Sequence, residues 1–128
     1  QEYDNFSCIV ADDCSTDDSY ELCQKVIGED KRFLLVKNDK NLGPLGNAYE
    51  SALRQFKHSD KNSIIVILDG DDFLYGKNVL STLNRHYNDY KCWMTYGSYI
   101  NLSDKKVGKF SKQVPQHVTD NNLYRNTC

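Results

Sequence analysis

The sequence lacks the features that mark several large classes of protein. No apolar run approaches the ~20 residues that a membrane-spanning helix requires, so no membrane segment is expected in this chain. Sixteen basic residues stand against 18 acidic ones, and a formal charge of −2 is too balanced for a general nucleic-acid-binding protein. No internal repeat or low-complexity tract is visible. The composition is that of a soluble globular protein, with 39% hydrophobic and 27% charged residues.

Cysteine patterns of the structural kind are also absent. The five cysteines are odd in number, and none pairs with another in a C-x-x-C motif. Neither a zinc cluster nor a secreted disulfide framework is therefore expected. Cys8 and Cys23 fall on apolar faces and are expected to act as small core residues. Reduced thiols indicate the cytoplasm or another reducing compartment.

The sequence has no initiator methionine and no recognisable signal peptide, and it begins at Gln1. We expect a processed or excised piece of a longer protein, from which targeting signals or a membrane-associating segment have been lost. The 128 residues are expected to form one domain that is incomplete at both ends.

Apolar patterning predicts strands that alternate with helices. Residues 64–68 are five consecutive aliphatic residues, which is typical of a central parallel strand covered by helices on both faces. Apolar residues between Leu45 and Phe56 step by three and four, as in an amphipathic helix. Gly28 is a plausible helix stop and Pro44 suits a helix start. Strands are expected at 6–11, 33–36, 64–68 and 91–100, and helices at 19–27, 45–56 and 77–87. This order predicts an α/β fold with a mainly parallel sheet.

Two acidic clusters directly follow predicted strands. Asp12 and Asp13 come after the first strand, and residues 69–72 (Asp-Gly-Asp-Asp) come after the central one. Ligands of open α/β sheets bind beyond the carboxyl ends of the strands. Because a parallel sheet aligns those ends, we expect both clusters to face one crevice.

The second cluster has the chemistry of a metal and diphosphate site. Its three carboxylates repel one another unless a cation joins them, and oxygen ligands suit Mg²⁺ or Mn²⁺ together with substrate phosphates. Gly70 lets the backbone turn sharply between its neighbours. The alternative is a solvated acidic turn, but the position after a buried strand favours a metal site. The expected metal ligands are Asp69, Asp71 and Asp72.

The loops after the first two strands each allow two interpretations. Residues 12–18 could serve only to cap the following helix. That role does not require Asp12 and Asp13, whose carboxylates could accept hydrogen bonds from a base N–H or a ribose hydroxyl. Residues 41–43 could form a plain turn, or they could leave a helix N-terminus open to an anion.

These motifs resemble those of glycosyltransferase family 2. Residues 9–17 (Ile-Val-Ala-Asp-Asp-Cys-Ser-Thr-Asp) resemble its V-D-D-G-S-T-D element, with Cys14 in place of the usual Gly. Residues 38–43 (Asn-Asp-Lys-Asn-Leu-Gly), followed by Asn47 and Ala48, resemble its N-x-x-N-x-G element, and residues 67–72 resemble its L-D-x-D-D metal motif. The motifs keep the family's order over about residues 5–100. The resemblance implies a GT-A type, Rossmann-like α/β/α sandwich, present as a fragment.

The resemblance also implies roles for the matched residues. Asp13, with Asp12 as a second candidate, would contact the uracil or the ribose. Asp69 would lie on the ribose or sugar side, and Asp71 would ligate the metal, with Asp72 as the alternative ligand. The nucleotide-sugar-binding residues implied in this way are Asp12, Asp13, Asn41, Gly43, Asp69, Gly70 and Asp71.

Two elements of the family have no counterpart. The strand that ends in P-x-Y-N and lines the nucleotide pocket should precede Gln1, and the general base should lie past Cys128, with Asp120 as the late candidate within the chain. We therefore expect that this chain alone is not a competent transferase. The isolated His58, His86 and His117 are expected to be surface or loop residues.

Residues 101–128 are expected to be a basic loop or hairpin and an acceptor-side segment. The basic residues are Lys105, Lys106, Lys109 and Lys112, which lie among Gly, Ser and Gln. Such a loop is usually just solvated, but it could bind an anionic acceptor. Residues 118–125 (Val-Thr-Asp-Asn-Asn-Leu-Tyr-Arg) resemble a subgroup from large DNA viruses and bacteria that includes collagen-type glucosyltransferases.

The sequence thus predicts a metal-dependent hexosyltransferase that moves a sugar from a UDP-sugar to a hydroxyl of a glycan, protein or lipid acceptor. Inverting members of the family use one displacement, in which a base deprotonates the acceptor while metal-bound UDP departs. Two alternatives stay open. A nucleotidyltransferase-like enzyme also places acidic metal ligands at strand ends, and a non-catalytic nucleotide-binding fragment would carry the same fold.

Overall fold

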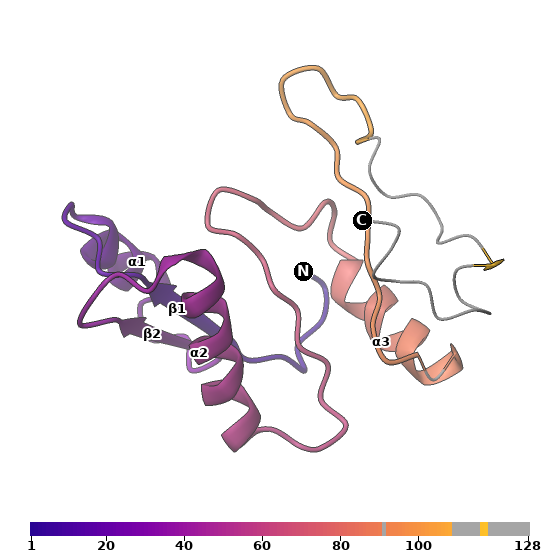
Figure 1. Cartoon of the computed structure of the whole chain (residues 1–128), viewed down its shortest axis with the longest axis horizontal. Coiled ribbons are helices and arrows are strands. Elements are labelled where there is room, and N and C mark those ends of the chain that lie inside the picture. The colour runs from indigo at the N-terminus through magenta and orange to yellow at the C-terminus, as the bar shows by residue number, and fades with distance from the viewer. Residues whose placement is uncertain (91, 109–115, 118–128) are drawn as a thin grey trace. The chain divides into compact units, whose positions relative to one another are not determined.

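The structure is a computed structural model, and it describes residues 1–90, 92–108 and 116–117 (Figure 1). The chain divides into two compact units, residues 1–84 and residues 85–128, and the division falls within the third helix. In the described part of the chain, no helix is long and apolar enough to cross a membrane.

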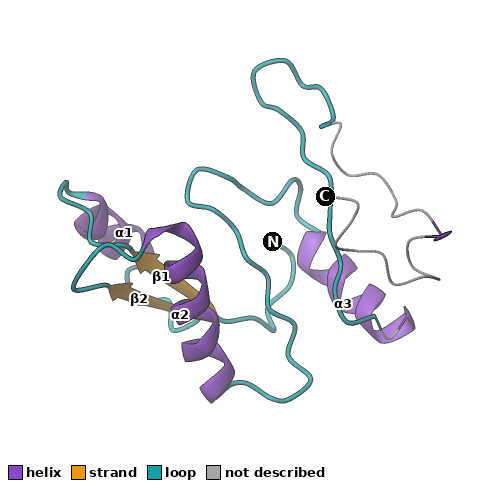
Figure 2. Cartoon of the chain, viewed as in Figure 1, coloured by secondary structure: helices purple, strands orange, loops and turns teal. Residues whose placement is uncertain are grey.

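The first unit is built on two parallel strands, β1 (Cys8–Asp12) and β2 (Phe33–Lys37) (Figure 2). Their register pairs Cys8 with Phe33 at one end and Asp12 with Lys37 at the other. Parallel strands need a crossover connection, and α1 (Ser19–Ile27) provides it. The βαβ order therefore brings the last residues of both strands to the same edge of the sheet.

The amino ends of the strands are tied together by apolar and backbone contacts. The Phe6 ring meets the Phe33 ring edge to face, with centroids 5.9 Å apart. The Arg32 guanidinium lies 4.8 Å from the Phe6 centroid, and the Cys8 N–H donates to the Arg32 carbonyl at 2.7 Å. Burial raises the pKa of the Cys8 thiol, in line with its expected place in the core. These contacts fix the register from its first residue.

Helix α1 occupies residues 19–27 as expected and contacts both strands. It ends at Gly28, whose φ of 57° is open to glycine and strained for other residues. The Gly28 N–H donates to the Gln24 carbonyl at 3.1 Å and so closes the last turn. The predicted helix stop is confirmed.

Helix α2 (Gly43–His58) follows β2 and packs on β1. It begins two residues before the expected start at Leu45, because Pro44 sits in the first turn, where its missing N–H has no helical partner to lose. A third helix, α3 (Val79–Tyr90), begins and ends slightly later than expected. All three predicted helices are therefore confirmed.

Two of the four predicted strands are wrong. Residues 64–68 form no strand, and Ile65, Val66, Ile67 and Leu68 are each at least 41% exposed. Aliphatic composition favours an extended backbone, but a strand also needs a neighbour for its N–H and C=O groups, and the described residues provide none here. The sheet of the described chain accordingly has two strands. Its parallel pairing and its helices still confirm the α/β class.

The second unit contains a short hairpin in place of the predicted strand at 91–100. Of its described residues, 92–100, only Ile100 pairs, through an isolated antiparallel bridge to Val107. The Gly108 N–H donates to the Tyr99 carbonyl at 2.7 Å, and the Asn101 N–H donates to the Lys106 carbonyl at 3.0 Å. Lys105 and Lys106 lie in this hairpin, while Lys109 and Lys112 lie outside the described residues.

The end of α1 yields a stability prediction. No heavy atom lies within 4 Å of a Cβ placed on Gly28, so Gly28→Ala adds only backbone strain. We expect it to lower the free energy of unfolding by about 1–2 kcal/mol, the usual cost of a left-handed alanine. Gly70→Ala is the matched control, since that site is equally open and its φ is outside the left-handed region. Urea denaturation measures both, and equal midpoints would contradict the assignment.

Candidate functional site

The carboxyl ends of β1 and β2 carry a dense set of polar side chains. Asp12 is the last residue of β1, and its side chain is 7% exposed. Its carboxylate lies 3.6 Å from the Lys37 ammonium, at the end of β2, and accepts the Ser15 N–H at 3.3 Å. Lys37 also lies 5.3 Å from the centroid of the Tyr20 ring. The sequence analysis missed Lys37, although its place as the last residue of the second strand was a usable signal.

Asp13 joins β1 to the loop that follows β2. Its Oδ1 atom accepts the Asn38 side-chain amide at 2.8 Å and the Leu42 N–H at 2.9 Å. Its Oδ2 atom accepts the Gly43 N–H at 2.8 Å. The Leu42 N–H and then the Asn38 amide lower the pKa of the Asp13 carboxyl, and partial burial opposes them. These donors stabilise the ionised form.

The beginning of α2 is therefore not open to an external anion. The backbone N–H groups of Leu42 and Gly43, which an anion would approach, already donate to Asp13. Asn41 reinforces this arrangement, since its Oδ1 also accepts the Gly43 N–H at 3.0 Å and its amide donates to the Asp13 carbonyl at 3.2 Å. Gly43 has a φ of 73°, which favours glycine. Residues 41–43 are thus a turn filled by an internal carboxylate.

Two asparagines extend this contact into the sheet. Asn38 is the one buried polar residue in the described part of the chain, at 9% exposure. Its Nδ2 donates both to Asp13 and, at 3.0 Å, to the Asn47 Oδ1. The Asn47 Nδ2 in turn donates to the Ala11 carbonyl at 3.2 Å. Both asparagines belong to the motif recognised in the sequence, but the sequence analysis assigned neither of them a role. An amide side chain shortly after a predicted strand was a signal that could have indicated one.

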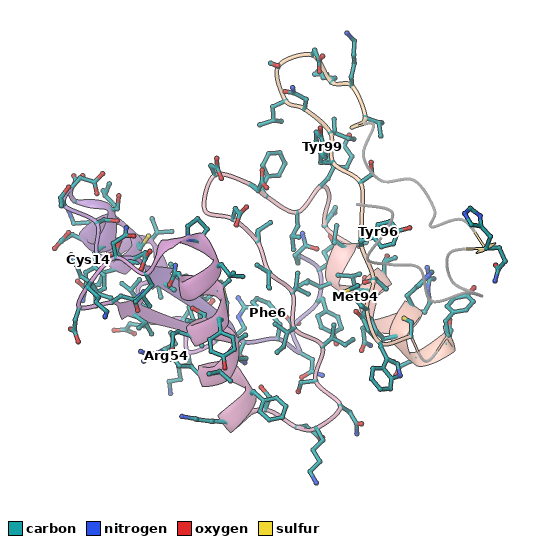
Figure 3. All side chains as sticks on the ribbon, in the orientation of Figure 1. Phe6, Cys14, Arg54, Met94, Tyr96 and Tyr99 are labelled. Carbon is teal, nitrogen blue, oxygen red and sulfur yellow. The ribbon has the colours of Figure 1, made fainter. Side chains whose placement is uncertain are left out.

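Cys14 occupies a position with glycine-like geometry. Its φ is 64°, in the left-handed region that side chains with a Cβ rarely adopt. The matching element of the family has a glycine at this position, and the left-handed backbone gives the physical reason for that preference. The thiol donates weakly to the Asp39 carbonyl, with Sγ 3.8 Å from the oxygen, so it links the loops after β1 and β2. Figure 3 shows where Cys14 lies in the first unit.

Residues 69–72 form an exposed turn in which the Asp72 N–H donates to the Asp69 carbonyl at 3.1 Å. Within the described chain, the side-chain carboxylates of Asp69, Asp71 and Asp72 form no hydrogen bond and no ion pair. Gly70 has no left-handed φ, so this turn does not require glycine, contrary to expectation.

The chemistry of the turn fits a hard divalent cation. Its carboxylate oxygens are the ligand type that Mg²⁺ and Mn²⁺ prefer, and they are accessible. The described residues contain no group of three or more His, Cys, Asp or Glu side chains placed together as metal ligands. The metal assignment therefore rests on residue type and sequence position.

Other predicted candidates do not join the described site. Asp120 and the 118–125 segment lie outside the described residues. His86 is exposed and packs against Tyr90, with ring centroids 4.6 Å apart, and His117 is exposed. The described cysteines, Cys8, Cys14, Cys23 and Cys92, are free thiols.

Comparison with known proteins identifies the class. The model of glycosyl transferase family 2 matches residues 1–126. The chain therefore belongs to glycosyl transferase family 2, and its class is that of enzymes that transfer sugars. No solved structure matches the chain. The collagen-type subgroup is not confirmed by these comparisons.

Curated relatives carry the same class in their names. The chain is 33% identical over 100 residues to an uncharacterized glycosyltransferase of Haemophilus influenzae, which covers 77% of this chain and 37% of the relative. It is 30% identical over 110 residues to the glycosyltransferase GlyG of Streptococcus pneumoniae, covering 86% and 34%. It is also 30% identical over 112 residues, covering 87% and 41%, to WfaP of Escherichia coli, a UDP-Glc:alpha-D-GlcNAc-diphosphoundecaprenol beta-1,3-glucosyltransferase. The chain thus spans roughly two fifths or less of each relative.

The ionised state of Asp13 yields a pH prediction. Its pKa in the folded protein is lower than in the unfolded chain, so its stabilising effect is complete above about pH 4. That effect is lost as the pH falls through the folded-state pKa. The amide resonances of Leu42 and Gly43 should stay constant from pH 7 to about 4 and then titrate together. Asp13→Asn should remove this shared titration, whereas independent titration of the two amides would contradict the bridging carboxylate.

The backbone of Cys14 yields a second prediction. Cys14→Val places a β-branched side chain at a φ of 64° and should destabilise the protein by about 1–2 kcal/mol. Cys14→Gly relieves strain but loosens the unfolded chain and loses the thiol contact, so its net change should stay within about 0.5 kcal/mol. Thermal unfolding under reducing conditions measures both, and a valine variant as stable as the glycine variant would refute the argument.

Proposed function

We propose that the protein transfers a sugar from a UDP-sugar donor to an acceptor hydroxyl, in a metal-dependent and inverting reaction. Membership in glycosyl transferase family 2 supports sugar transfer. The donor is favoured by the E. coli relative, whose name gives UDP-Glc as its substrate. The transferred sugar is proposed to be a hexose. The acceptor named for that relative is not assigned to this protein. The observation that carries the proposal is the meeting of the Asp12-Asp13 motif with the carboxyl ends of the two parallel strands.

In this proposal, Asp13 is the first candidate for the carboxylate that faces the nucleoside, and Asp12 is the second. The Asp12 side chain is 7% exposed and pairs with Lys37, and its contacts to Ser15 are 3.3 Å long. Asp13 has shorter bonds, and three of its roughly four acceptor positions are filled. Asn41 and Gly43 would then border the nucleotide site through the turn that Asp13 holds, rather than through a free helix end.

The 69–72 turn is proposed to hold the cation and the diphosphate. Asp71 is assigned as the principal metal ligand, Asp69 and Asp72 as its partners, and Asp69 also as a contact to the ribose or sugar. Bound Mn²⁺ or Mg²⁺ would supply charge neutralisation for the departing diphosphate. The exposed carboxylates of this turn are free to bind it, and the space beside Gly70 is open, with no heavy atom within 4 Å of a Cβ placed there.

The acceptor proton requires a general base, a contribution on the order of 10²–10⁴ in rate. The strand-end carboxylates already have partners, Lys37 for Asp12 and the turn after β2 for Asp13, so neither is assigned as the base. We assign the base to the rest of the enzyme, with Asp120 as the candidate inside this chain. The competent enzyme is then the full reading frame that contains this chain, and the isolated chain retains at most weak UDP binding.

The metal assignment is tested with the full reading frame. Wild-type protein should bind UDP much more tightly with Mn²⁺ than with EDTA, and it should transfer sugar from a UDP-sugar. Asp71→Asn should weaken Mn²⁺-dependent UDP binding at least tenfold, about 1.4 kcal/mol, because a metal ligand loses its charge. Asp89→Asn, an exposed carboxylate on α3, is the matched control and should change nothing.

Titration calorimetry with UDP and ADP separates the competing functions. Tight UDP binding and weak ADP binding support the UDP-sugar transferase, and comparable ADP binding favours a nucleotidyltransferase-like enzyme. If Asp71→Asn binds UDP as the wild type does in Mn²⁺, the metal site is not at the 69–72 turn.

A further inference from the structure

We propose that Lys37 is a positioning residue of the donor site: from the end of β2, its ammonium group holds the loop of residues 12–18 in the conformation that receives the nucleoside. This inference rests on the proposed function, since it assumes that the acidic pair of that loop faces a nucleoside diphosphate. It assigns a role to a residue that belongs to none of the motifs matched in the sequence.

The parallel register places Lys37 beside the first residue of this loop. Asp12 ends β1 opposite Lys37 in β2, and the ammonium lies 3.6 Å from the Asp12 carboxylate. The Asp12 side chain is 7% exposed, whereas that of Lys37 is 40% exposed. A carboxylate so far removed from water needs a compensating charge. Lys37 is the one cation that the described residues pair with it.

The other contacts of Lys37 reach the far end of the same loop. Its ammonium lies 5.3 Å from the centroid of the Tyr20 ring, in the first turn of α1, a distance at which an aromatic ring attracts a cation. Hydrogen bonds from Ser19 chiefly lower the pKa of the Asp17 carboxyl, and the charge of Lys37 lowers it further. Lys37 therefore attracts groups at both ends of the loop, from Asp12 to the start of the helix.

The loop needs this counter-charge because it is strongly acidic. Residues 12–18 contain four aspartates and no basic residue, and like charges so close together repel one another. In the described chain, the pair of Lys37 with Asp12 is the one ion pair that reaches the loop. Without Lys37, the Asp12 carboxylate could regain solvation only by moving toward water, and Asp13 would be displaced with it. The bonds of Asp13 to the turn after β2 limit that movement, so a partial loss of donor binding is expected.

Lys40 provides a matched control. It is an exposed lysine in the loop that follows β2, and the described structure gives its side chain no ion pair or hydrogen bond. Lys40→Met removes the same charge as Lys37→Met from a nearby position, so a general change in the charge of the protein affects both variants. Lys37→Arg keeps the charge and can still pair with Asp12.

The experiment uses the full reading frame and measures sugar transfer from a UDP-sugar. Donor KM should rise about tenfold in Lys37→Met, a size typical of coupling between residues in contact. It should stay within about twofold of wild type in Lys37→Arg and Lys40→Met, because neither change removes the charge beside Asp12. The kcat of Lys37→Met should stay within about threefold, because the loss applies equally to bound substrate and transition state.

Uridine separates positioning from direct contact with the diphosphate. It carries the nucleoside without phosphates, so it offers no anionic group for Lys37 to bind. The inhibition constants of uridine and UDP should therefore rise by about the same factor in Lys37→Met. A raised constant for UDP beside an unchanged one for uridine would mean that Lys37 binds the phosphates, and it would overturn the positioning role.

Two further outcomes would overturn the inference. Equal weakening in Lys40→Met and Lys37→Met would mean a general effect of charge, and an unchanged donor KM in Lys37→Met would mean that the loop does not depend on Lys37. If Lys37→Met does not fold in a thermal unfolding test, Lys37→Gln replaces it, since its amide can still donate to Asp12 but carries no charge. The same effects are expected there in weaker form, and normal constants for uridine and donor would reject the role.

The wild-type measurement separates this inference from the proposed function. Wild-type protein that binds no UDP in Mn²⁺ would reject the donor assignment, and the positioning role with it, before any variant is compared. Wild-type protein that binds UDP, with Lys37 variants that fail the paired test, would reject only the positioning role.

Discussion

The hydrogen bonds that the Asp13 carboxylate accepts hold the candidate site together. Asp13 leaves the end of β1 and accepts hydrogen bonds from a turn that lies about 30 residues later in the sequence. It thereby supplies the cap that α2 lacks from its own residues, since Leu42 at the N-cap offers no side-chain acceptor. Without it, the N–H groups at the start of α2 would need other partners. The helix start, the turn and the strand end are one hydrogen-bonded unit.

The neighbouring carboxylates of Asp12 and Asp13 are each balanced by a different kind of positive charge. Asp12 is balanced by Lys37, whose place opposite it follows from the parallel register. Asp13 is balanced by N–H dipoles instead of a cation. The two adjacent carboxylates therefore do not share one counter-ion, because each has its own source of positive potential.

The sequence predicted elements whose causes are local and missed those whose causes are distant. Helix α1 was placed at residues 19–27 because apolar spacing and Gly28 both lie within the segment. The aliphatic run at 64–68 does not form a strand, because a strand also depends on a partner elsewhere in the chain and the described residues provide none. The site shows the same division. The motif named Asp13 as important, but its bonding could be learned only from the way the turn returns to β1.

The direction of the hydrogen bonds in the Asn38–Asn47 pair limits which substitutions the protein can tolerate at these positions. Each amide must present its nitrogen on one side and its oxygen on the other, because Asn38 donates twice and Asn47 both accepts and donates. An Asn-to-Asp change needs a single nucleotide and alters neither size nor shape. At position 38 it would nevertheless place a second negative charge where an amide now lies 2.8 Å from the Asp13 oxygen. A single-nucleotide change that leaves the size of the side chain unaltered should thus be poorly tolerated at this buried position.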